Sequence, residues 1–468
     1  MRQSAVLLAV VLSLFASLLH AGAQEVGREI YQQRCSWCHG NEGRGDGPSA
    51  VGMFPPPRDL VRADYKIRST PHGQLPTDDD IFNVISRGFP GTPMEGWNAI
   101  LDEEDIWNLV SYVKSLSPRF EDEPRNPLDP PPLSQIDVDR GERIYKDAKC
   151  TLCHGVAGRG EGEITTRLAF DWGLPHSARD LTRGWTLKGG SEPQEIYLRI
   201  TGGLNGTPMG PYRDLLSDQD RWALATYVAS LDREPLETSE DFVVAAARVD
   251  GSLPDSLADP AWEMASVVLV PLAGQVVQDP PSRWWTPTAG SAAIRALWNG
   301  TEVGFLLEWN DPTETVGGDI LPDSAFLQFG DLNGSKPYFL LGDDNSPVRI
   351  WHWQAGDSVE EWTAAGALEI DTHLAAFRAT GVWEDGRWHV IFRRSATGEP
   401  GFMEGEFVPI LISVRDGANG EAGNLRAIST WLYTTIEPTR SLRSVLVFLM
   451  FLLGTVIVEL SVLARIRR

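Results

Sequence analysis

The sequence predicts a multidomain protein with two related all-α domains, one all-β sandwich domain and one C-terminal transmembrane helix. Three observations lead to this prediction. One set of motifs occurs twice in the same order, the spacing of apolar residues then changes from helical to strand-like, and a long apolar run lies close to the C-terminus. Repeats and changes of hydrophobic period are strong sequence signals of domain organisation.

Length and composition agree with several folded domains. The chain has 468 residues, more than one hydrophobic core normally supports. Hydrophobic residues make up 42% of the sequence and charged residues 22%, which is the composition of a globular protein. The net charge of −23, without a basic stripe, excludes nucleic acid as a partner. An acidic surface instead favours solubility and attracts basic partners.

The N-terminus carries the features of a signal peptide. Arg2 precedes a short apolar run that ends in the small-x-small pattern AGA at residues 21–23. We therefore expect residues 1–23 to be removed and the mature chain to begin near Gln24. The domains that follow would be exported.

A second membrane signal lies close to the C-terminus. The run VLVFLMFLLGTVIVELSVLA supplies about the 20 residues that cross a bilayer as a helix. We expect this helix over residues 442–464, and the arginines of the tail 465–468 place that tail in the cytoplasm by the positive-inside rule. The sequence thus predicts a single-pass protein of the cytoplasmic membrane whose other domains lie in the periplasm.

The repeat covers residues 24–117 and 138–232. GREIYQQRCSWCHGNEGRGDG returns as GERIYKDAKCTLCHGVAGRGEG, and the motifs RDL, GTPM and DIWNLVSYVKSL return after it in the same order. The helical spacing of apolar residues in DIWNLVSYVKSL predicts a closing helix, and a first helix should precede the cysteines. Residues 118–137, between the copies, are rich in proline and charge and predict an extended linker.

A third domain is expected over residues 242–437, where the helical spacing disappears. SVVLVPLAGQVV, GRWHVIFRRS and FVPILISVRDG are short, β-branched and aromatic, and Gly, Asn and Asp separate such segments. WNGTEV and WEDGRWHV contain Asn-Gly and Asp-Gly pairs that predict tight hairpins. A β-sandwich is the simplest architecture for these strands. Its many tryptophans are favoured as packing residues, with carbohydrate binding as a minor alternative.

All four cysteines lie in two Cys-x-x-Cys-His motifs. These are Cys35, Cys38 and His39 in the first copy and Cys150, Cys153 and His154 in the second. A closed zinc site would need a fourth ligand, and neither copy repeats a further cysteine or histidine. Dithiol redox chemistry would leave the histidine without a role. Covalent c-type haem accounts for each residue, because the thiols add to the haem vinyl groups and the histidine binds iron.

The second axial ligand of each haem is expected from the motif GTPM. Met94 and Met209 follow the second cysteine of their copy at the same distance. A lone methionine is usually a flexible core residue. Its recurrence in the same motif favours His/Met ligation, which raises the reduction potential relative to histidine alone. We therefore predict two covalently bound haems c and no catalytic residue.

These motifs place the first half of the chain in a known family by resemblance. Residues 25–232 resemble two class I cytochrome c domains in tandem, in which a TPM segment is followed by LSD, a tryptophan and YVxSL.

Residues 242–437 resemble the haem-b-binding subunit of ethylbenzene dehydrogenase and its relatives. The resemblance rests on DPAWEMASVVLVPLAGQ, VGFLLEWNDPTET, DSAFLQFG, PYFLLGDDNSPVRIWHWQA and AISTWLYTT. It implies a sandwich that holds one haem b between a methionine and a lysine. It also implies a gamma-type subunit of a periplasmic molybdenum oxidoreductase, such as dimethyl sulfide dehydrogenase, selenate reductase or nitrite oxidoreductase, that exchanges electrons with iron–sulfur clusters.

The haem b ligands that this resemblance implies do not transfer to the sequence. Leu340 and Leu341 occupy the place of the methionine, while Leu425 and Arg426 occupy that of the lysine. Arginine stays protonated and is a poor iron ligand. A third haem, of type b, is therefore left open, and a core or surface role is favoured for each remaining candidate: Met264, Met403, Lys336, His352, His373 and His389. Segments 331–335 and 342–345 could hold calcium but are favoured as turns.

The sequence as a whole predicts a membrane-anchored multihaem electron carrier, with the cytochrome subunit of a periplasmic molybdenum oxidoreductase as the favoured function. Its expected partners are redox proteins, including molybdenum and iron–sulfur subunits. The alternative is a free-standing respiratory cytochrome c between a quinol-oxidising complex and a terminal oxidase, with the β domain as a docking or ligand-binding module. An enzyme with an open haem site, such as a peroxidase, is disfavoured because both haems have a sixth ligand.

Overall fold

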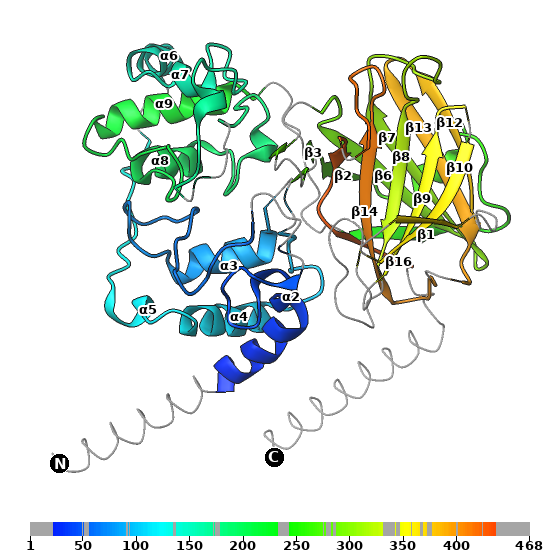
Figure 1. Cartoon of the computed structure of the whole chain (residues 1–468), viewed down its shortest axis with the longest axis horizontal. Coiled ribbons are helices and arrows are strands. Elements are labelled where there is room, and N and C mark those ends of the chain that lie inside the picture. Colours follow the sequence, from blue (N-terminus) through cyan, green and yellow to red (C-terminus); the bar gives the residue numbers. More distant parts are fainter. Residues whose placement is uncertain are drawn as a thin grey trace, which may run out of the picture.

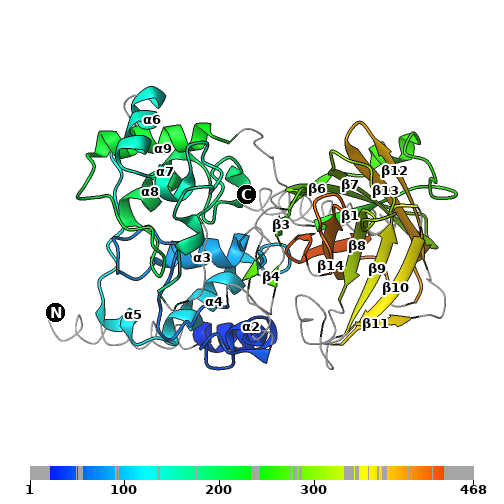
Figure 2. The ribbon, with the colours of Figure 1, turned by 45° about the horizontal axis from the view of Figure 1, so that its top comes forward.

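Two helical domains lie beside one large β domain in the computed structural model of the chain (Figures 1 and 2). The structure describes residues 22–48, 50, 56–89, 92, 94–133, 137–171, 173, 178–232, 243–274, 276–277, 282–283, 287–330, 342, 347–356, 358–365, 368–371, 377–398, 401–423 and 425–436. No helix within these ranges is long and apolar enough to cross a bilayer. The transmembrane helix expected over 442–464 and almost all of the expected signal peptide lie outside the described residues.

The first helical domain is built on a helix over residues 22–34 and on the helices that follow it. These are α2 (Ser36–His39), α3 (Asp78–Arg87), α4 (Glu103–Ser115) and the short α5 (Arg119–Asp122). Thr77 caps the N-terminus of α3 and exchanges side-chain and backbone hydrogen bonds with Asp80 in a capping box. The helix α4 buries Ile106, Leu109, Val110 and Val113, so the closing helix predicted from the apolar spacing is confirmed.

The second helical domain repeats this arrangement. Its helices are α6 (Val138–Asp147), α7 (Thr151–His154), α8 (Pro193–Gly202) and α9 (Asp218–Ser230), with 3₁₀ turns at Thr165–Arg167 and Gly184–Thr186. One residue more separates Tyr145 from Cys150 than Tyr31 from Cys35. Lys149 accommodates this extra residue with a left-handed φ of 60°, so the cysteine motif starts in an equivalent place in both copies.

The first and last helices of each copy cross at a glycine. A Cβ atom on Gly27 would lie 2.1 Å from the backbone oxygen of Asn108, and one on Gly141 would lie 2.1 Å from that of Ala223. Tyrosine rings pack beside each crossing, Tyr31 on Tyr112 at 5.1 Å and Tyr145 on Tyr227 at 5.4 Å between centroids. Backbone-to-backbone contact therefore sets the distance between these helices.

Buried polar contacts join the two helical domains. Arg68 of the first domain is 6% exposed and donates to the backbone oxygens of Gly202, at 2.6 Å, and Gly203, at 3.2 Å, in the second. The connecting segment packs on both, since the Leu128 amide donates to Ser69 and the Trp222 indole donates to the Pro131 carbonyl. The prediction that 118–137 is extended throughout is wrong at its start, where α5 forms.

The β domain is one large sheet that folds over on itself. Its strands are β1 (Val243–Arg248), β2 (Val268–Pro271), β3 (Ala273–Gly274), β6 (Ser291–Trp298), β7 (Glu302–Asn310), β8 (Ser324–Phe329), β9 (Val348–Gln354), β10 (Ser358–Ala364), β11 (Leu368–Asp371), β12 (Phe377–Glu384), β13 (Arg387–Ser395), β14 (Phe407–Arg415), β15 (Ala427–Ile428) and β16 (Leu432–Ile436). A separate pair is formed by β4 (Val276–Val277) and β5 (Ser282–Arg283), and a 3₁₀ helix spans Pro260–Met264.

The strand order creates two layers with a shared core. Neighbouring strands follow the order β11-β10-β9-β8-β14-β16-β1-β6-β7-β13-β12. Phe305 on β7 nevertheless packs against Trp351 on β9, and Trp351 stacks on Phe377 of β12 at 5.2 Å. Strands far apart in the sheet therefore face one another, and the parallel strand β1 joins the two layers by pairing with β16 and β6.

Both predicted hairpins are present. The strands β6 and β7 pair antiparallel across Asn299-Gly300, and β12 and β13 pair across Asp385-Gly386. Asp385 and Gly386 have φ values of 50° and 77°, as a type I′ turn requires.

Most tryptophans that the structure describes in this domain are buried, which agrees with a packing role. Seven of them are at most 8% exposed: Trp262, Trp298, Trp309, Trp351, Trp353, Trp388 and Trp431. A buried ring cannot form part of an exposed sugar-binding platform, so the carbohydrate alternative has no support from these residues.

The glycine crossing yields a stability prediction for Gly141→Ala. Alanine gains about 1 kcal/mol of helix propensity, but overpacking costs about 1–3 kcal/mol, and here the clashing atom is a backbone oxygen that cannot rotate away. We expect the free energy of unfolding to fall by about 1–2 kcal/mol, measured by chemical denaturation. The control Arg143→Ala changes an exposed residue of α6 and should leave stability almost unchanged. Equal or greater stability of Gly141→Ala would contradict the close crossing.

Candidate functional site

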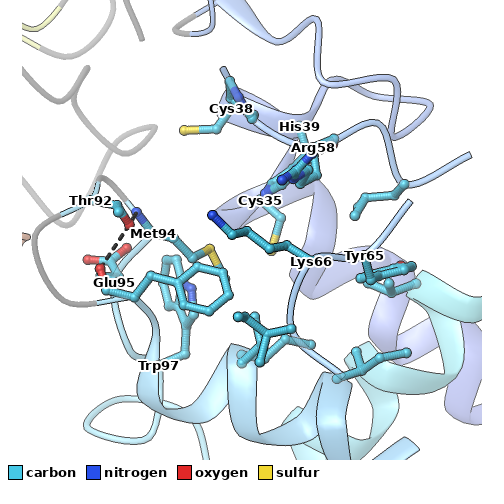
Figure 3. Close-up of a pocket in the computed structure, with 18 of the residues that line it drawn as sticks. Cys35, Cys38, His39, Arg58, Tyr65, Lys66, Thr92, Met94, Glu95 and Trp97 are labelled. Atoms are coloured by element: carbon cyan, nitrogen blue, oxygen red, sulfur yellow. Dashed lines mark hydrogen bonds between the residues drawn. The ribbon is translucent and has the colours of Figure 1, made fainter. Parts of the chain in front are cut away.

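The first helical domain encloses an apolar cavity around the first cysteine motif. Cys35, Cys38 and His39 line it from one side, and Met94 lines it together with Leu109 and Val113 of α4. Figure 3 shows the sulfur atoms of Met94 and Cys35 and the imidazole of His39 around this cavity, with the side chain of Lys66 extending into it. The structure therefore brings all four residues predicted for the first site to one place.

The second domain has a corresponding cavity. Cys150, His154 and Met209 line it, and Leu224 and Val228 of α9 take the places of Leu109 and Val113. Cys153 belongs to the same short helix α7 but is not among the residues that line this cavity. Three of the four residues predicted for the second site thus share one cavity, with the fourth next to His154 in the chain.

Each histidine is oriented by a backbone carbonyl oxygen, in an equivalent way in the two copies. The Nδ1 atom of His39 lies 3.0 Å from the carbonyl oxygen of Arg58, and Nδ1 of His154 lies 3.0 Å from that of Arg179. An Nδ1–H that donates to this oxygen leaves Nε2 unprotonated and available to a metal. Burial lowers the pKa of both imidazoles, although the hydrogen bond opposes this, so both rings are favoured in the neutral form that binds iron.

The glycine-rich loop after each histidine turns the chain back so that a loop amide contacts the backbone oxygen of that histidine. The amides of Gly45 and Gly160 donate to the backbone oxygens of His39 and His154 at 2.8 and 2.9 Å. Both glycines have φ above 70°, and a Cβ on either would lie within 2.6 Å of a neighbouring backbone oxygen. Only glycine fits such a position.

The threonine of GTPM explains why this motif recurs. In each copy the threonine hydroxyl accepts a hydrogen bond from the methionine amide, Thr92 from Met94 at 3.2 Å and Thr207 from Met209 at 3.3 Å. The methionine oxygen in turn accepts from Phe89 or Leu204, at 2.7 and 2.9 Å. The same tight turn therefore presents a thioether to each cavity.

The thiols of the second copy are unsuited to dithiol exchange. None of the four cysteines takes part in a disulfide. Burial raises the pKa of the Cys150 thiol to about 11 and also raises that of Cys153. Exchange requires a thiolate near neutral pH, so these side chains are better suited to covalent attachment of a group than to redox cycling.

The two cavities adjoin at the interface of the helical domains. Lys66, Ile67 and Lys188 line both of them. Lys66 lies 5.9 Å from the ring centroid of Phe170 in the second domain, and Lys188 lies 5.2 Å from that of Phe89 in the first. Groups bound in the two cavities would therefore be neighbours.

The β domain covers part of the first cavity, which sequence analysis did not anticipate. Trp431, which is 2% exposed, is one of the lining residues. Tyr433 on β16 donates to a carboxylate oxygen of Glu95, next to Met94, at 3.4 Å, and Cys38 packs against the cluster that contains Trp431 and Phe326. Trp431 and Tyr433 both belong to the segment AISTWLYTT, one of those on which the resemblance of this domain to haem-b-binding subunits rests.

The candidates for a third haem are dispersed. Met264 and Met403 are 61% and 59% exposed, and His389 contacts Glu308 at 2.9 Å. His352 alone among the described candidates is fully buried, stacked on Phe326 at 4.3 Å, and its Nδ1 lies 3.2 Å from Glu360. Burial and the charges of Arg415 and Arg426 lower the pKa of His352 to about 3. The remaining candidates Lys336 and His373, with Leu340, Leu341, 331–335 and 343–345, lie outside the described residues.

Comparison with known proteins identifies the helical half. The family model "Cytochrome c" matches residues 24–117 and 138–232, so the two helical domains are tandem cytochrome c domains. Such domains carry covalently bound haem c. The donors present fit this group, because each apolar cavity combines cysteine thiol, a buried neutral imidazole and a thioether.

Several relatives are subunits of redox complexes. Dimethylsulfide dehydrogenase subunit gamma of Rhodovulum sulfidophilum is 29% identical over 28% of this chain and 55% of its own length. The Cbb3-type cytochrome c oxidase subunit CcoP of Azospirillum brasilense is 27% identical over 46% of this chain and 63% of its own. A reducing HAO-like protein complex of Kuenenia stuttgartiensis, Kustc0457/Kustc0458, contains a chain that is 42% identical over 44% of this chain and 96% of its own, with a TM-score of 0.42. The chain spans little more than half of the two curated relatives named here.

Proposed function

We propose that the tandem cytochrome c domains relay single electrons through two His/Met c-type haems, as the cytochrome subunit of a periplasmic oxidoreductase complex. The observation that carries this proposal is the pair of adjoining cavities with equivalent donors. Each offers cysteine thiol for attachment, a histidine fixed by a backbone oxygen, and a methionine presented by the same threonine turn.

In the first domain, Cys35 and Cys38 would hold the haem through thioether bonds, with His39 and Met94 as axial ligands. In the second, Cys150 and Cys153 would attach it, and His154 and Met209 would be the ligands. When bound, each haem iron takes up one electron and passes one on, changing its oxidation state by one each time. The chain supplies the ligands, excludes water and sets the potentials.

The shared wall of the cavities supports serial transfer within the chain. Because Lys66, Ile67 and Lys188 contact both cavities, an electron could pass between the haems without an additional protein. The two lysines would also compensate the negative charge of haem carboxylates at this interface. Because the histidine and the methionine of each cavity would both bind its haem iron, we propose that the chemistry on the substrate takes place on a partner.

We propose that this partner contains molybdenum and iron–sulfur subunits, and that the β domain connects it to the first haem. Similarity to a subunit of dimethylsulfide dehydrogenase supports the partner class. The β domain supplies Trp431 to the wall of the first cavity, which supports a path that enters through this domain. A signal peptide and a C-terminal membrane helix would place the complex on the periplasmic side of the cytoplasmic membrane.

Haem analysis of the protein purified from its native membrane tests this function. We expect two covalent haems per chain in the pyridine haemochrome spectrum, and molybdenum in the same purified complex. Acid-acetone extraction then decides whether the β domain adds a haem b. Two covalent haems in a preparation without molybdenum, still reduced by a quinol-oxidising complex, would favour the free-standing respiratory cytochrome instead.

Replacement of either proposed methionine ligand should change one haem. In Met94→Ala or Met209→Ala we expect both haems to stay attached while the potential of one falls on the order of 0.1 V, a fraction of the roughly 0.8 V that axial ligands control. Spectroscopic redox titration measures this. Met264→Ala is the matched control, because that methionine is exposed in the β domain. Unchanged potentials in both ligand variants would refute the assignment.

Removal of the indole that closes the first cavity should affect only the first haem. Trp431→Ala would admit water, which stabilises the more highly charged oxidised iron, so the potential of the first haem should fall while that of the second stays the same. Trp431→Phe keeps the apolar wall and should restore the potential. If Trp431→Ala changed the potentials of both haems, or of neither, the proposed contact between the β domain and the first haem would be contradicted.

A further inference from the structure

The β domain contains three buried carboxylates that the proposed electron transfer does not use. Asp311, Asp323 and Asp416 are 0%, 0% and 5% exposed, and each offers a carboxylate oxygen within 4.8 Å of the other two. Asp311 follows β7 in one layer of the sheet, whereas Asp323 precedes β8 and Asp416 follows β14 in the other. The cluster therefore joins loops of both layers.

Two of these carboxylates are held in place by neutral donors. Asp323 accepts hydrogen bonds from the amides of Gly417 and Thr315, at 2.8 and 2.7 Å, and from the indole of Trp388 at 3.0 Å. Asp416 accepts from the Thr288 hydroxyl and from the Asn419 amide. These donors orient the oxygens but bring no positive charge to the cluster.

Asp311 has an oxygen without a partner. Its Oδ1 accepts from the Thr313 amide at 3.1 Å, whereas its Oδ2 is buried and has no hydrogen-bond partner within the described part of the chain. A buried carboxylate oxygen without a partner is strongly unfavourable. This unsatisfied acceptor lies beside two other buried carboxylates, and the hydrogen-bond donors described above for those two are neutral.

The donor chemistry selects the kind of ion. All three side chains offer hard oxygen ligands, which suit calcium or magnesium rather than the softer transition metals. Magnesium needs a near-ideal octahedron and usually keeps several waters, while calcium accepts irregular sets of carboxylate and carbonyl oxygens. The three aspartates come from three separate loops and are buried, and such an irregular site suits calcium better than magnesium.

We propose that Asp311, Asp323 and Asp416 form a calcium site that ties the two layers of the β domain together. The ion would bind the Asp311 oxygen that has no hydrogen-bond partner within the described part of the chain. It would also bridge loops that are otherwise joined by neutral hydrogen bonds. This site is independent of the haem ligands, and so of the proposed function.

Calcium titration of the full-length haem protein tests the site. After removal of bound metal with a chelator, we expect calorimetry to show one calcium bound per chain and the thermal midpoint to rise on addition of calcium chloride. Asp311→Asn keeps the shape of the side chain and removes its charge, so it should abolish both effects. Asp319→Asn removes an exposed carboxylate from the same loop and should retain both. Unchanged haem absorption and circular dichroism establish that each variant is folded.

Several outcomes would overturn the proposal. The metal-free protein could take up no calcium and melt at the same temperature with and without it, in which case the carboxylates share a proton instead. Calcium binding retained by Asp311→Asn would place the ion elsewhere. Magnesium chloride that binds as tightly as calcium chloride would refute the choice of ion.

Discussion

The close crossing of the first and last helices is the constraint on which each cytochrome domain depends. At Gly27 and Gly141 there is no room for even one methyl group, so the backbone of one helix rests on that of the other. This contact fixes the start of the cysteine motif above the apolar face of the closing helix. The histidine then finds its carbonyl partner on the next loop, and the threonine turn brings the methionine to the same cavity. A haem with two axial ligands needs donors from separate chain segments, and the crossing makes their positions reproducible.

The three domains meet at the walls of the two cavities. The helical domains meet at a wall that both cavities share. Arg68 joins the two domains by donating hydrogen bonds to two backbone oxygens of the second domain. The β domain contributes a tryptophan to the wall of the first cavity, but none of its residues lines the second within the described part of the chain. The cavities are thus arranged in series, from the β domain through the first helical domain to the second. Such a layout suits the transfer of electrons in one line between two partners.

The β domain combines an aromatic core with unusual charge burial. Strands distant in the sheet order meet through Phe305, Trp351 and Phe377, which hold the two layers together by apolar contact. At one end of the layers, aspartates of three loops bring carboxylate oxygens within 4.8 Å of one another. Burial of several carboxylates in one place is unfavourable without a compensating charge or proton. A bound ion would supply that charge at this end of the domain.

Local features of the sequence determined much of this protein. The repeat, the cysteine motifs, the closing helices and the turns at Asn299-Gly300 and Asp385-Gly386 depend on neighbouring residues, so their patterns predicted them. The tertiary structure alone decided which backbone oxygens orient the histidines, that Trp431 closes the first cavity, and that three aspartates meet. In the sequence, Asp311, Asp323 and Asp416 each look like an ordinary residue at the end of a strand. Only the folding of one sheet over itself brings their charges within a few ångströms, because contacts between distant segments leave no local pattern.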